Sequence, residues 1–340
     1  MIRCFARAAK YKNIQRTPQF DVAGSMKRRR FERAFLLNRA FNRFVTMCGK
    51  AFLTALIWPR FVAPFRWHIT RYPLALAHLD PAFEGYKILQ LTDLHVGRTD
   101  ASYLQKVIAR CIQEKPDLVV ITGDLIDYDP KSLPILQRLL KPLVASKPRD
   151  GIAAIFGNHD YHEYSWRHVG PRSAHRSIHR RLVKLLHGLG IRLLRNEQLQ
   201  ITQKTPAGAV ANFVIVGLDE MWTHRADPAK AFRGIGPNDA VICLQHNPDG
   251  IEFLKPYPWQ YMLCGHTHGG QARFPFVGPL YIPMEHRQYI RGFFYFSPLP
   301  GQEIPRRTMF VSTGLGYSAP IRVLCRPEAT LFTLTSCHTP

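Results

Sequence analysis

The order of apolar stretches beyond the N-terminal quarter of the chain is the feature that most constrains its fold. We expect strands at 87–93, 117–124 and 152–160, the last including the loop that follows it. Stretches of helical periodicity lie between them, at 102–114 and 132–146. Strands and helices that alternate in this way predict parallel strands joined by right-handed crossovers. The chain should therefore have an α/β fold.

The second half of the chain adds more strands than helices. Further strands are expected at 212–218, 240–245, 260–264, 309–313 and 330–335. One further helix is expected at 178–189. Two packed sheets flanked by helices fit this pattern better than one doubly wound sheet. Two segments rich in aromatic residues, 161–181 and 274–308, do not follow the pattern and are either surface loops or loops that cover a substrate.

Polar residues of the kind that bind metals follow five of the expected strands. The segments are Thr92–His95, Gly123–Asp124, Gly157–Asp160, Gln245–Pro248 and Gly265–His268. In the last, CGHTHGGQ, two histidines stand one residue apart between glycines. The carboxyl ends of strands are where α/β proteins place their binding sites. Five separate solvent-exposed turns are a less economical explanation than one shared site.

The types of donor atom in these segments indicate the chemistry. Aspartate and asparagine oxygens combined with imidazole nitrogens suit Mn²⁺, Fe²⁺ or Zn²⁺. A hydrolase with two metals needs one carboxylate between the ions, which then lie ~3.5–4 Å apart. Asp124 is the best candidate for this carboxylate, because Gly123 before it lets the backbone approach closely.

Taken in order, the five segments resemble the DxH, GD, GNH(D/E), H and GHxH motifs of calcineurin-like metallophosphoesterases. The resemblance implies a four-layer αββα sandwich and two divalent cations, with manganese expected and iron, zinc or magnesium as alternatives. It implies that one cation is held by Asp93, His95 and His268, that the other is held by Asn158, His246 and His266, and that Asp124 bridges them. It also implies that His159 stabilises phosphoryl oxygens or protonates the leaving group, and that Asp160 orients His159 or its turn.

The resemblance continues beyond these motifs. GHTHGGQARFP, YIRGFF, FVSTGLGYSAPIR and RPEATLFTL are similar to segments of the bacterial, often membrane-associated YaeI/YkuE subgroup. That subgroup includes a UDP-2,3-diacylglucosamine pyrophosphatase of lipid A biosynthesis, which implies hydrolysis of this glycolipid to UMP and lipid X. Candidate contacts for the substrate are Arg167, His168, Arg172 and Arg273. Candidates for an acyl slot are Phe274, Phe276, Phe293, Phe294, Tyr295 and Phe296. A phosphodiesterase or phosphatase of broader specificity is the alternative.

Positive charge is concentrated near the N-terminus. The net charge is +22, and residues 1–72 hold 16 lysines and arginines against Asp21 and Glu32, which gives +14 there and +8 elsewhere. Arginines and large apolar residues interleave over 27–61, a pattern typical of a basic amphipathic helix on an anionic membrane. Charged residues and proline interrupt the segment, so a membrane span is not expected. We assign 1–80 to a membrane-associating segment and 81–340 to the metallophosphoesterase domain.

Other interpretations of the N-terminal segment stay open. It could be a signal peptide, a nucleic-acid arm or a helix that packs on its own domain, and Met26 is a second candidate start. The seven cysteines lack any CxxC pair and are typical of reduced thiols in the cytosol. We therefore expect a peripheral or monotopic protein at the cytoplasmic face of the inner membrane, with no specific nucleic-acid partner. The alternative from a different functional class is a non-catalytic scaffold that binds membrane or nucleic acid.

Overall fold

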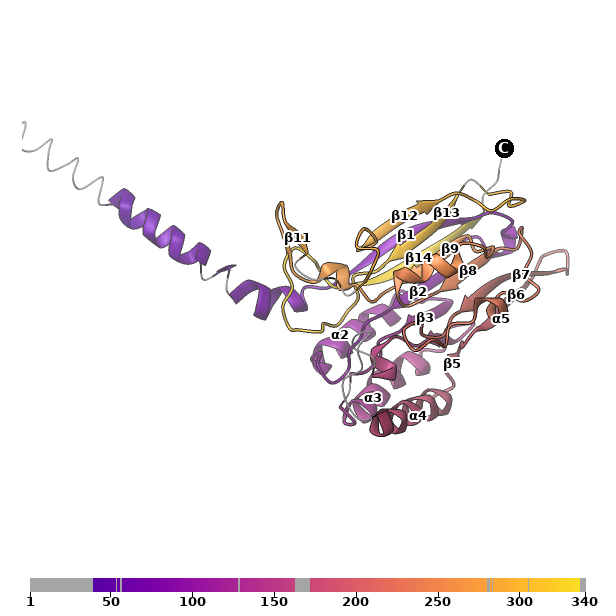
Figure 1. Cartoon of the computed structure of the whole chain (residues 1–340), viewed down its shortest axis with the longest axis horizontal. Coiled ribbons are helices and arrows are strands. Elements are labelled where there is room, and N and C mark those ends of the chain that lie inside the picture. The colour runs from indigo at the N-terminus through magenta and orange to yellow at the C-terminus, as the bar shows by residue number, and fades with distance from the viewer. Residues whose placement is uncertain are drawn as a thin grey trace, which may run out of the picture. The chain divides into compact units, whose positions relative to one another are not determined.

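The computed structural model describes residues 39–336, apart from 53, 56, 128, 163–171, 280, 281, 283 and 305. Side chains are not described at 172–176. The chain divides into two compact units, residues 1–56 and 57–340 (Figure 1). The candidate site lies wholly in the second unit, which we describe first.

The first sheet of the second unit is mixed and has six strands. Its order is β1-β14-β2-β3-β4-β5, and all its neighbours pair in parallel except β14 and β2. The strands are β1 (His68–Leu76), β14 (Glu328–Ser336), β2 (Lys87–Leu91), β3 (Leu118–Thr122), β4 (Ile152–Ile155) and β5 (Arg192–Leu193). Because β2, β3 and β4 are parallel neighbours, the loops that follow them lie at one edge of the sheet.

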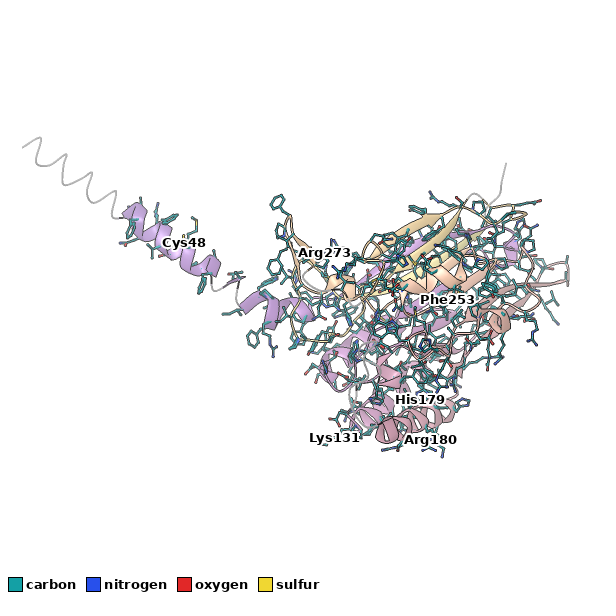
Figure 2. The ribbon with its side chains drawn as sticks, viewed as in Figure 1. Cys48, Lys131, His179, Arg180, Phe253 and Arg273 are labelled. Atoms are coloured by element: carbon teal, nitrogen blue, oxygen red, sulfur yellow. The ribbon has the colours of Figure 1, made fainter. Side chains whose placement is uncertain are left out.

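The second sheet also has six strands, in the order β12-β13-β9-β8-β7-β6. Its central strands β13, β9, β8 and β7 pair in parallel, and the two outer strands run antiparallel to their neighbours. The strands are β12 (Gly292–Phe296), β13 (Arg307–Val311), β9 (Tyr261–Cys264), β8 (Val241–Leu244), β7 (Val210–Gly217) and β6 (Glu197–Lys204). A small hairpin, β10 (Arg273–Phe274) and β11 (Gly278–Pro279), follows β9, and Figure 2 labels Arg273 on it.

Successive side chains of each strand point to opposite faces of its sheet, and the interior therefore contains three apolar clusters. Leu89 and Leu91 of β2 face the helices α2 (Ala101–Ile112), α3 (Ser132–Ala145) and α4 (Arg172–Gly188). Ile88, between them, faces the second sheet instead. The outer face of the second sheet is covered by the short helices α5 (Pro228–Ala231) and α6 (Ile251–Leu254). The predicted four-layer αββα arrangement is therefore confirmed (Figure 1).

Single-turn helices complete the second unit. They are the π-helical turn η1 (Trp58–Val62) and the 3₁₀ turns η2 (Ala63–Phe65), η3 (Pro81–Phe83), η4 (His159–Tyr161), η5 (Pro248–Gly250) and η6 (His268–Gly270). Three of them, η4, η5 and η6, follow strand ends that carry predicted site residues. The strand β1 also belongs to this unit, although the sequence placed residues up to 80 in the N-terminal segment.

The first unit contributes a helix over residues 39–52, on which Figure 2 labels Cys48. Its side chains are exposed, including Phe41, Phe44 and Phe52. Residues 1–38, which hold 10 of the 16 lysines and arginines of residues 1–72, lie outside the described residues. Among the described residues we find no helix with the length and apolar character that a membrane crossing requires. The amphipathic membrane helix stays a prediction.

Candidate metal centre

The seven predicted metal ligands come from loops that follow β2, β3, β4, β8 and β9, and all seven side chains meet between the two sheets. Asp93, His95 and Asp124 have φ angles of 54°, 42° and 52°, and His266 and His268 have φ angles of 70° and 49°. Positive φ is uncommon for residues other than glycine and costs roughly 1–3 kcal/mol at each position. The sandwich holds these side chains in strained backbone positions, which is typical of functional sites.

Asp93, His95 and His268 form the first group of donor atoms. His95 Nε2 lies 3.0 Å from His268 Nε2 and 4.0 Å from Asp93 Oδ1. His268 Nε2 lies 3.6 Å from the same carboxylate oxygen. Each residue offers one ligand atom within 4.8 Å of the others, and all three side chains are buried. The first group therefore has the composition and spacing of a metal site.

Asp124, His246 and His266 form the second group. His246 Nε2 lies 3.2 Å from Asp124 Oδ2, and His266 Nδ1 lies 3.0 Å from Asn158 Oδ1. The same Asp124 oxygen lies 3.5 Å from His95 Nε2, in the first group. One carboxylate oxygen therefore contacts both groups.

Hydrogen bonds between the sheets fix these side chains. His246, after β8, donates from Nδ1 to the Thr122 carbonyl of β3 over 2.7 Å. Because a carbonyl only accepts, this bond places the Nδ1 proton and turns Nε2 toward Asp124. The backbone N–H of His266 donates to both Asp93 carboxylate oxygens, at 3.0 and 3.2 Å. The loops of the first sheet and those of the second sheet therefore hold each other in position at the site.

Glycines make the close approach possible. A Cβ atom at Gly123, where φ is 96°, would lie 2.5 Å from His246 Nδ1 and 2.7 Å from the Gly157 nitrogen. A Cβ atom at Gly314, where φ is 66°, would lie 2.7 Å from the Asp93 Cβ. Any larger residue would push the ligands apart, so these glycines are steric requirements of the site.

Burial and mutual charge shift the pKa values of the cluster. Burial lowers the pKa of His95 to about 3 and holds that of His268 well below its ordinary value. Burial opposes the charged forms of Asp124 and His246 as well, but their mutual attraction is stronger. It holds the pKa of Asp124 well below its ordinary value and raises that of His246 to about 10. The pKa of Asp93 rises to about 6 through burial and the neighbouring Asp124 charge.

The donor set fits divalent cations. Carboxylate, amide and imidazole donors make up the two groups, and none of the seven residues is more than 5% exposed. The pKa shifts leave His95 and His268 neutral near pH 7, the form in which an imidazole nitrogen binds a metal. Grouping so many polar side chains in a dry interior is costly without a partner that accepts their lone pairs.

His159 lies beside the first group. Its ring contacts that of His95 edge to face, with centroids 4.5 Å apart, and its Nδ1 lies 3.3 Å from Asp127 Oδ1. Burial lowers the pKa of His159, but the carboxylates of Asp124 and Asp127 raise it by more, so the net shift is upward. Its backbone N–H also donates to Asp124 Oδ1 over 2.9 Å. His159 is therefore oriented by carboxylates on two sides.

Asp160 is fully buried. The hydrogen bonds described for its carboxylate all come from backbone N–H groups. It accepts hydrogen bonds from Leu125 and Ile126 after β3 and from Gly157 after β4. Its pKa is raised to about 7 by burial and by the Asp124 charge. These contacts join the two loops that carry Asp124, Asn158 and His159, and the Asp160 charge also raises the pKa of the His159 ring.

The predicted substrate contacts are only partly described. Arg167 and His168 lie outside the described residues, and for Arg172 only the backbone, at the start of α4, is described. Arg273 is half-buried and its Nη1 lies 3.5 Å from the Gly269 carbonyl, next to His268. Of the acyl-slot aromatics, Phe293 packs on the core between the sheets and Phe294 and Phe296 pack on the outer core.

The sequence interpretation did not single out three residues beside the site. Asp127 contacts His159, and its position three residues after Asp124 in GDLID was the available signal. Trp222, after β7, packs edge to face on His266 with ring centroids 4.9 Å apart. Arg322 is fully buried and donates to the carbonyl oxygens of Gly316 and His268 at 2.5 and 3.4 Å. No local signal marked the last two.

Comparison with known families agrees with this geometry. The family model described as calcineurin-like phosphoesterase matches residues 86–270, which span all the candidate ligands. The chain belongs to the calcineurin-like phosphoesterase family. It is therefore a metal-dependent hydrolase of phosphoesters, as the sequence motifs predicted.

Three curated relatives match most of this phosphoesterase. Phosphodiesterase YaeI of Escherichia coli is 34% identical over 73% of this chain and 82% of its own. The uncharacterised metallophosphoesterase YkuE of Bacillus subtilis is 28% identical over 83% of this chain and 90% of its own. UDP-2,3-diacylglucosamine pyrophosphatase LpxG of Chlamydia muridarum is 29% identical over 80% of this chain and 90% of its own.

Proposed function

We propose that this hydrolase cleaves the pyrophosphate bond of UDP-2,3-diacylglucosamine, releasing UMP and 2,3-diacylglucosamine 1-phosphate. The observation that carries the proposal is the contact of Asp124 Oδ2 with both donor groups, at 3.5 and 3.2 Å. A site with two metals that share a carboxylate suits attack on a phosphorus atom. The similarity to LpxG over 80% of this chain supports the choice of substrate.

The proposed roles of the side chains follow their grouping. Asp93, His95 and His268 would hold one cation, Asn158, His246 and His266 the other, and Asp124 both. Two divalent cations, when bound there, would polarise the phosphoryl group and lower the pKa of water. Manganese is our first choice, because the donor set mixes carboxylate oxygens with imidazole nitrogens.

The hydrolysis itself exchanges two bonds at phosphorus. An oxygen of water bonds to one phosphorus atom, the bond from that atom to the bridging oxygen breaks, and the bridging oxygen leaves with the other phosphate. His159 can hydrogen-bond to the phosphoryl oxygens or give a proton to the leaving oxygen, since its raised pKa favours the protonated ring. Its Nδ1 lies 3.3 Å from Asp127 Oδ1, so a proton on Nδ1 would be donated to that carboxylate.

The membrane assignment is part of the same proposal. A substrate with two acyl chains resides in a membrane, and the exposed phenylalanines of the helix at 39–52 suit a peripheral attachment. We propose that the enzyme works at the cytoplasmic face of the inner membrane. Nucleic acid has no role in this proposal.

A phosphodiesterase of broader specificity is the second candidate, and the match to YaeI favours it. The two candidates differ in how much the parts of the glycolipid other than its phosphates raise kcat/KM. Purified protein with Mn²⁺ and detergent should hydrolyse UDP-2,3-diacylglucosamine at least ~100-fold faster than bis-p-nitrophenyl phosphate, measured as kcat/KM. The opposite ranking would replace the first candidate with the second.

A pair of variants separates catalysis by this site from contamination. Asp124→Asn keeps an oxygen for the His159 N–H but loses the charge beside His95 and His246, so turnover should fall at least ~100-fold. Asp239→Asn changes an exposed aspartate outside the metal centre and should retain activity. Equal loss in both variants, or in neither, would count against the assigned site.

A further inference from the structure

A cavity of about 610 Å³ lies at the opposite edge of the sandwich from β5 and β6. Its walls come from β1 and β14 of the first sheet, from β12 and β13 of the second, and from η1 and η2. The edge strands β1 and β12 meet there through Tyr72 and Phe293, whose rings pack edge to face with centroids 4.9 Å apart. The volume lies within the ~300–1,000 Å³ typical of small-molecule sites.

Three exposed arginines surround the cavity, and none forms an ion pair with a carboxylate of the described residues. Arg326 donates to the carbonyl oxygens of Arg66 and Trp67, at 2.5 and 3.0 Å. Arg291 donates to the Leu324 carbonyl over 3.3 Å, and the Arg66 guanidinium lies 5.3 Å from the Trp58 ring centroid. Guanidinium groups held in this way keep several N–H donors for an anion.

A single carboxylate, that of Glu328, also lines the cavity. It is 7% exposed, and one of its oxygens accepts from the Thr313 N–H and the Ser312 hydroxyl, at 2.8 and 3.3 Å. One carboxylate offsets at most one of the three arginine charges. The cavity therefore presents a net positive charge to a ligand.

The remaining lining combines the polar residues His68, Thr70 and Thr313 with apolar side chains that continue onto the surface. Trp58 and Leu324 border the cavity while 42% and 66% exposed. Three positions away from each in sequence, Phe61 is 62% exposed and Ile321 is 40% exposed. Large apolar side chains around a basic cavity favour a ligand with both an anionic group and a hydrocarbon part.

This cavity is separate from the metal centre but is joined to it by one residue. None of the seven candidate ligands lines it. Cys325 does, and its Sγ donates to the carbonyl oxygen of His268 over 3.0 Å. A molecule in the cavity would therefore lie one side chain away from the backbone of a proposed metal ligand.

We propose that this cavity is a second binding site, for a phosphate ester that carries an acyl chain. The phosphate binds among Arg66, Arg291 and Arg326, and the chain lies on Trp58, Tyr72 and Leu324. Arginine pairs with phosphate through two parallel hydrogen bonds, which explains the use of three guanidinium groups. A membrane lipid is the natural source of such a ligand. The site binds without reaction, and the proposal does not depend on the identity of the enzyme's substrate.

Calorimetric titration of the full-length protein with dihexanoyl phosphatidate, below its micelle concentration, tests this site. We expect binding at least tenfold tighter than that of inorganic phosphate, which lacks the chain, or of dihexanoyl phosphatidylcholine, which lacks net negative charge. Equal affinity for inorganic phosphate would identify a plain anion site and overturn the proposal. Equal affinity for the phosphatidylcholine would overturn the role of the arginines.

Variants locate the binding. Arg291→Glu should weaken phosphatidate binding at least tenfold, whereas Arg138→Glu, a charge reversal at an exposed arginine of α3, should leave it unchanged. Asp124→Asn should also retain it, because Asp124 does not line the cavity. Thermal melting confirms that each variant is folded. Binding that survives Arg291→Glu but is lost in Asp124→Asn would place the lipid at the metal centre and overturn the proposal.

Discussion

His95 Nε2 and His268 Nε2 lie 3.0 Å apart, although 173 positions separate the two residues in the chain. Burial lowers the pKa of both rings, to about 3 for His95 and well below the ordinary value for His268. Both imidazoles are therefore neutral at pH 7, and their facing nitrogens, beside Asp93, are suited to share one cation.

Replacing one of these rings should remove one of the two metals. We expect His95→Ala to bind about one metal fewer per chain and to lose at least ~100-fold in kcat, since even indirect support of a metal is worth 10–100-fold. Metal analysis by mass spectrometry and steady-state kinetics measure the two effects. His187→Ala, at an exposed position of α4, is the matched control and should retain both. Full metal content in His95→Ala would contradict the assignment.

Removal of the metals should also destabilise the fold. Ligands that bind only the folded state stabilise it by mass action, by about 2.7 kcal/mol when their concentration is 100 times Kd. Chelation should therefore lower the melting temperature, and Mn²⁺ should restore it. The shift should be smaller in Asp124→Asn, which lacks the shared carboxylate. An identical shift in that variant would mean that the stabilising metal binds elsewhere.

The dependence on leaving group distinguishes acid catalysis by His159 from a structural role. An acid matters most when the leaving oxygen is strongly basic. His159→Ala should therefore slow hydrolysis of an alkyl phosphodiester by roughly 10²–10⁴-fold and that of a p-nitrophenyl ester much less. Asp127→Asn, which alters the partner of His159 Nδ1 and also of the Arg98 guanidinium, should show the same pattern with smaller losses. Equal losses on both substrates would show that His159 does not act as the general acid.

His179 should make stability depend on pH. This residue, labelled in Figure 2 on α4, stacks on Tyr161 with ring centroids 4.0 Å apart, and its Nδ1 lies 3.0 Å from the Asp160 carbonyl. Burial lowers its pKa in the fold. The neutral ring therefore contributes stability that is complete above the unfolded pKa of about 6.5 and is lost as pH falls toward the lower folded value.

The measurement is the free energy of unfolding in urea between pH 7.5 and 5. His179→Gln should flatten the fall in stability below pH 6.5, because the group that takes up the proton on unfolding is gone. His187→Gln, at an exposed position of the same helix, should leave the slope as it is. An unchanged slope in His179→Gln would show that other groups set the pH dependence.

Arg322 should be needed for both stability and metal binding. Its buried guanidinium donates to the carbonyls of Gly314, Gly316 and His268. Arg322→Met leaves these oxygens without their donor, and each buried unsatisfied group costs ~1–3 kcal/mol. We expect urea unfolding to show a loss of about 3 kcal/mol and metal affinity to fall. Arg138→Met is the exposed control, and equal stability of both variants would contradict this role.

Much of the second unit could be predicted because its signals are local. The apolar runs that became β2, β3, β4, β8 and β9 are short, flanked by polar turns and fully or almost fully buried. Strand β1 gave no such signal. In β1, HITRYPLAL contains Arg71 and Pro73, yet it pairs in parallel with β14, about 260 positions later. Proline is tolerated there because β1 is an edge strand.

The sequence by itself determined the chemistry, because five short motifs carry the donor types and their order along the chain. Only the tertiary structure decided which donors meet, that Asp127 supports His159, and that Arg322 lies buried beneath His268. It also decided that β1 and β12 enclose a basic cavity. The physical reason is that each of these contacts joins residues far apart in the chain, and packing of the two sheets against each other sets such distances, whereas local propensity does not.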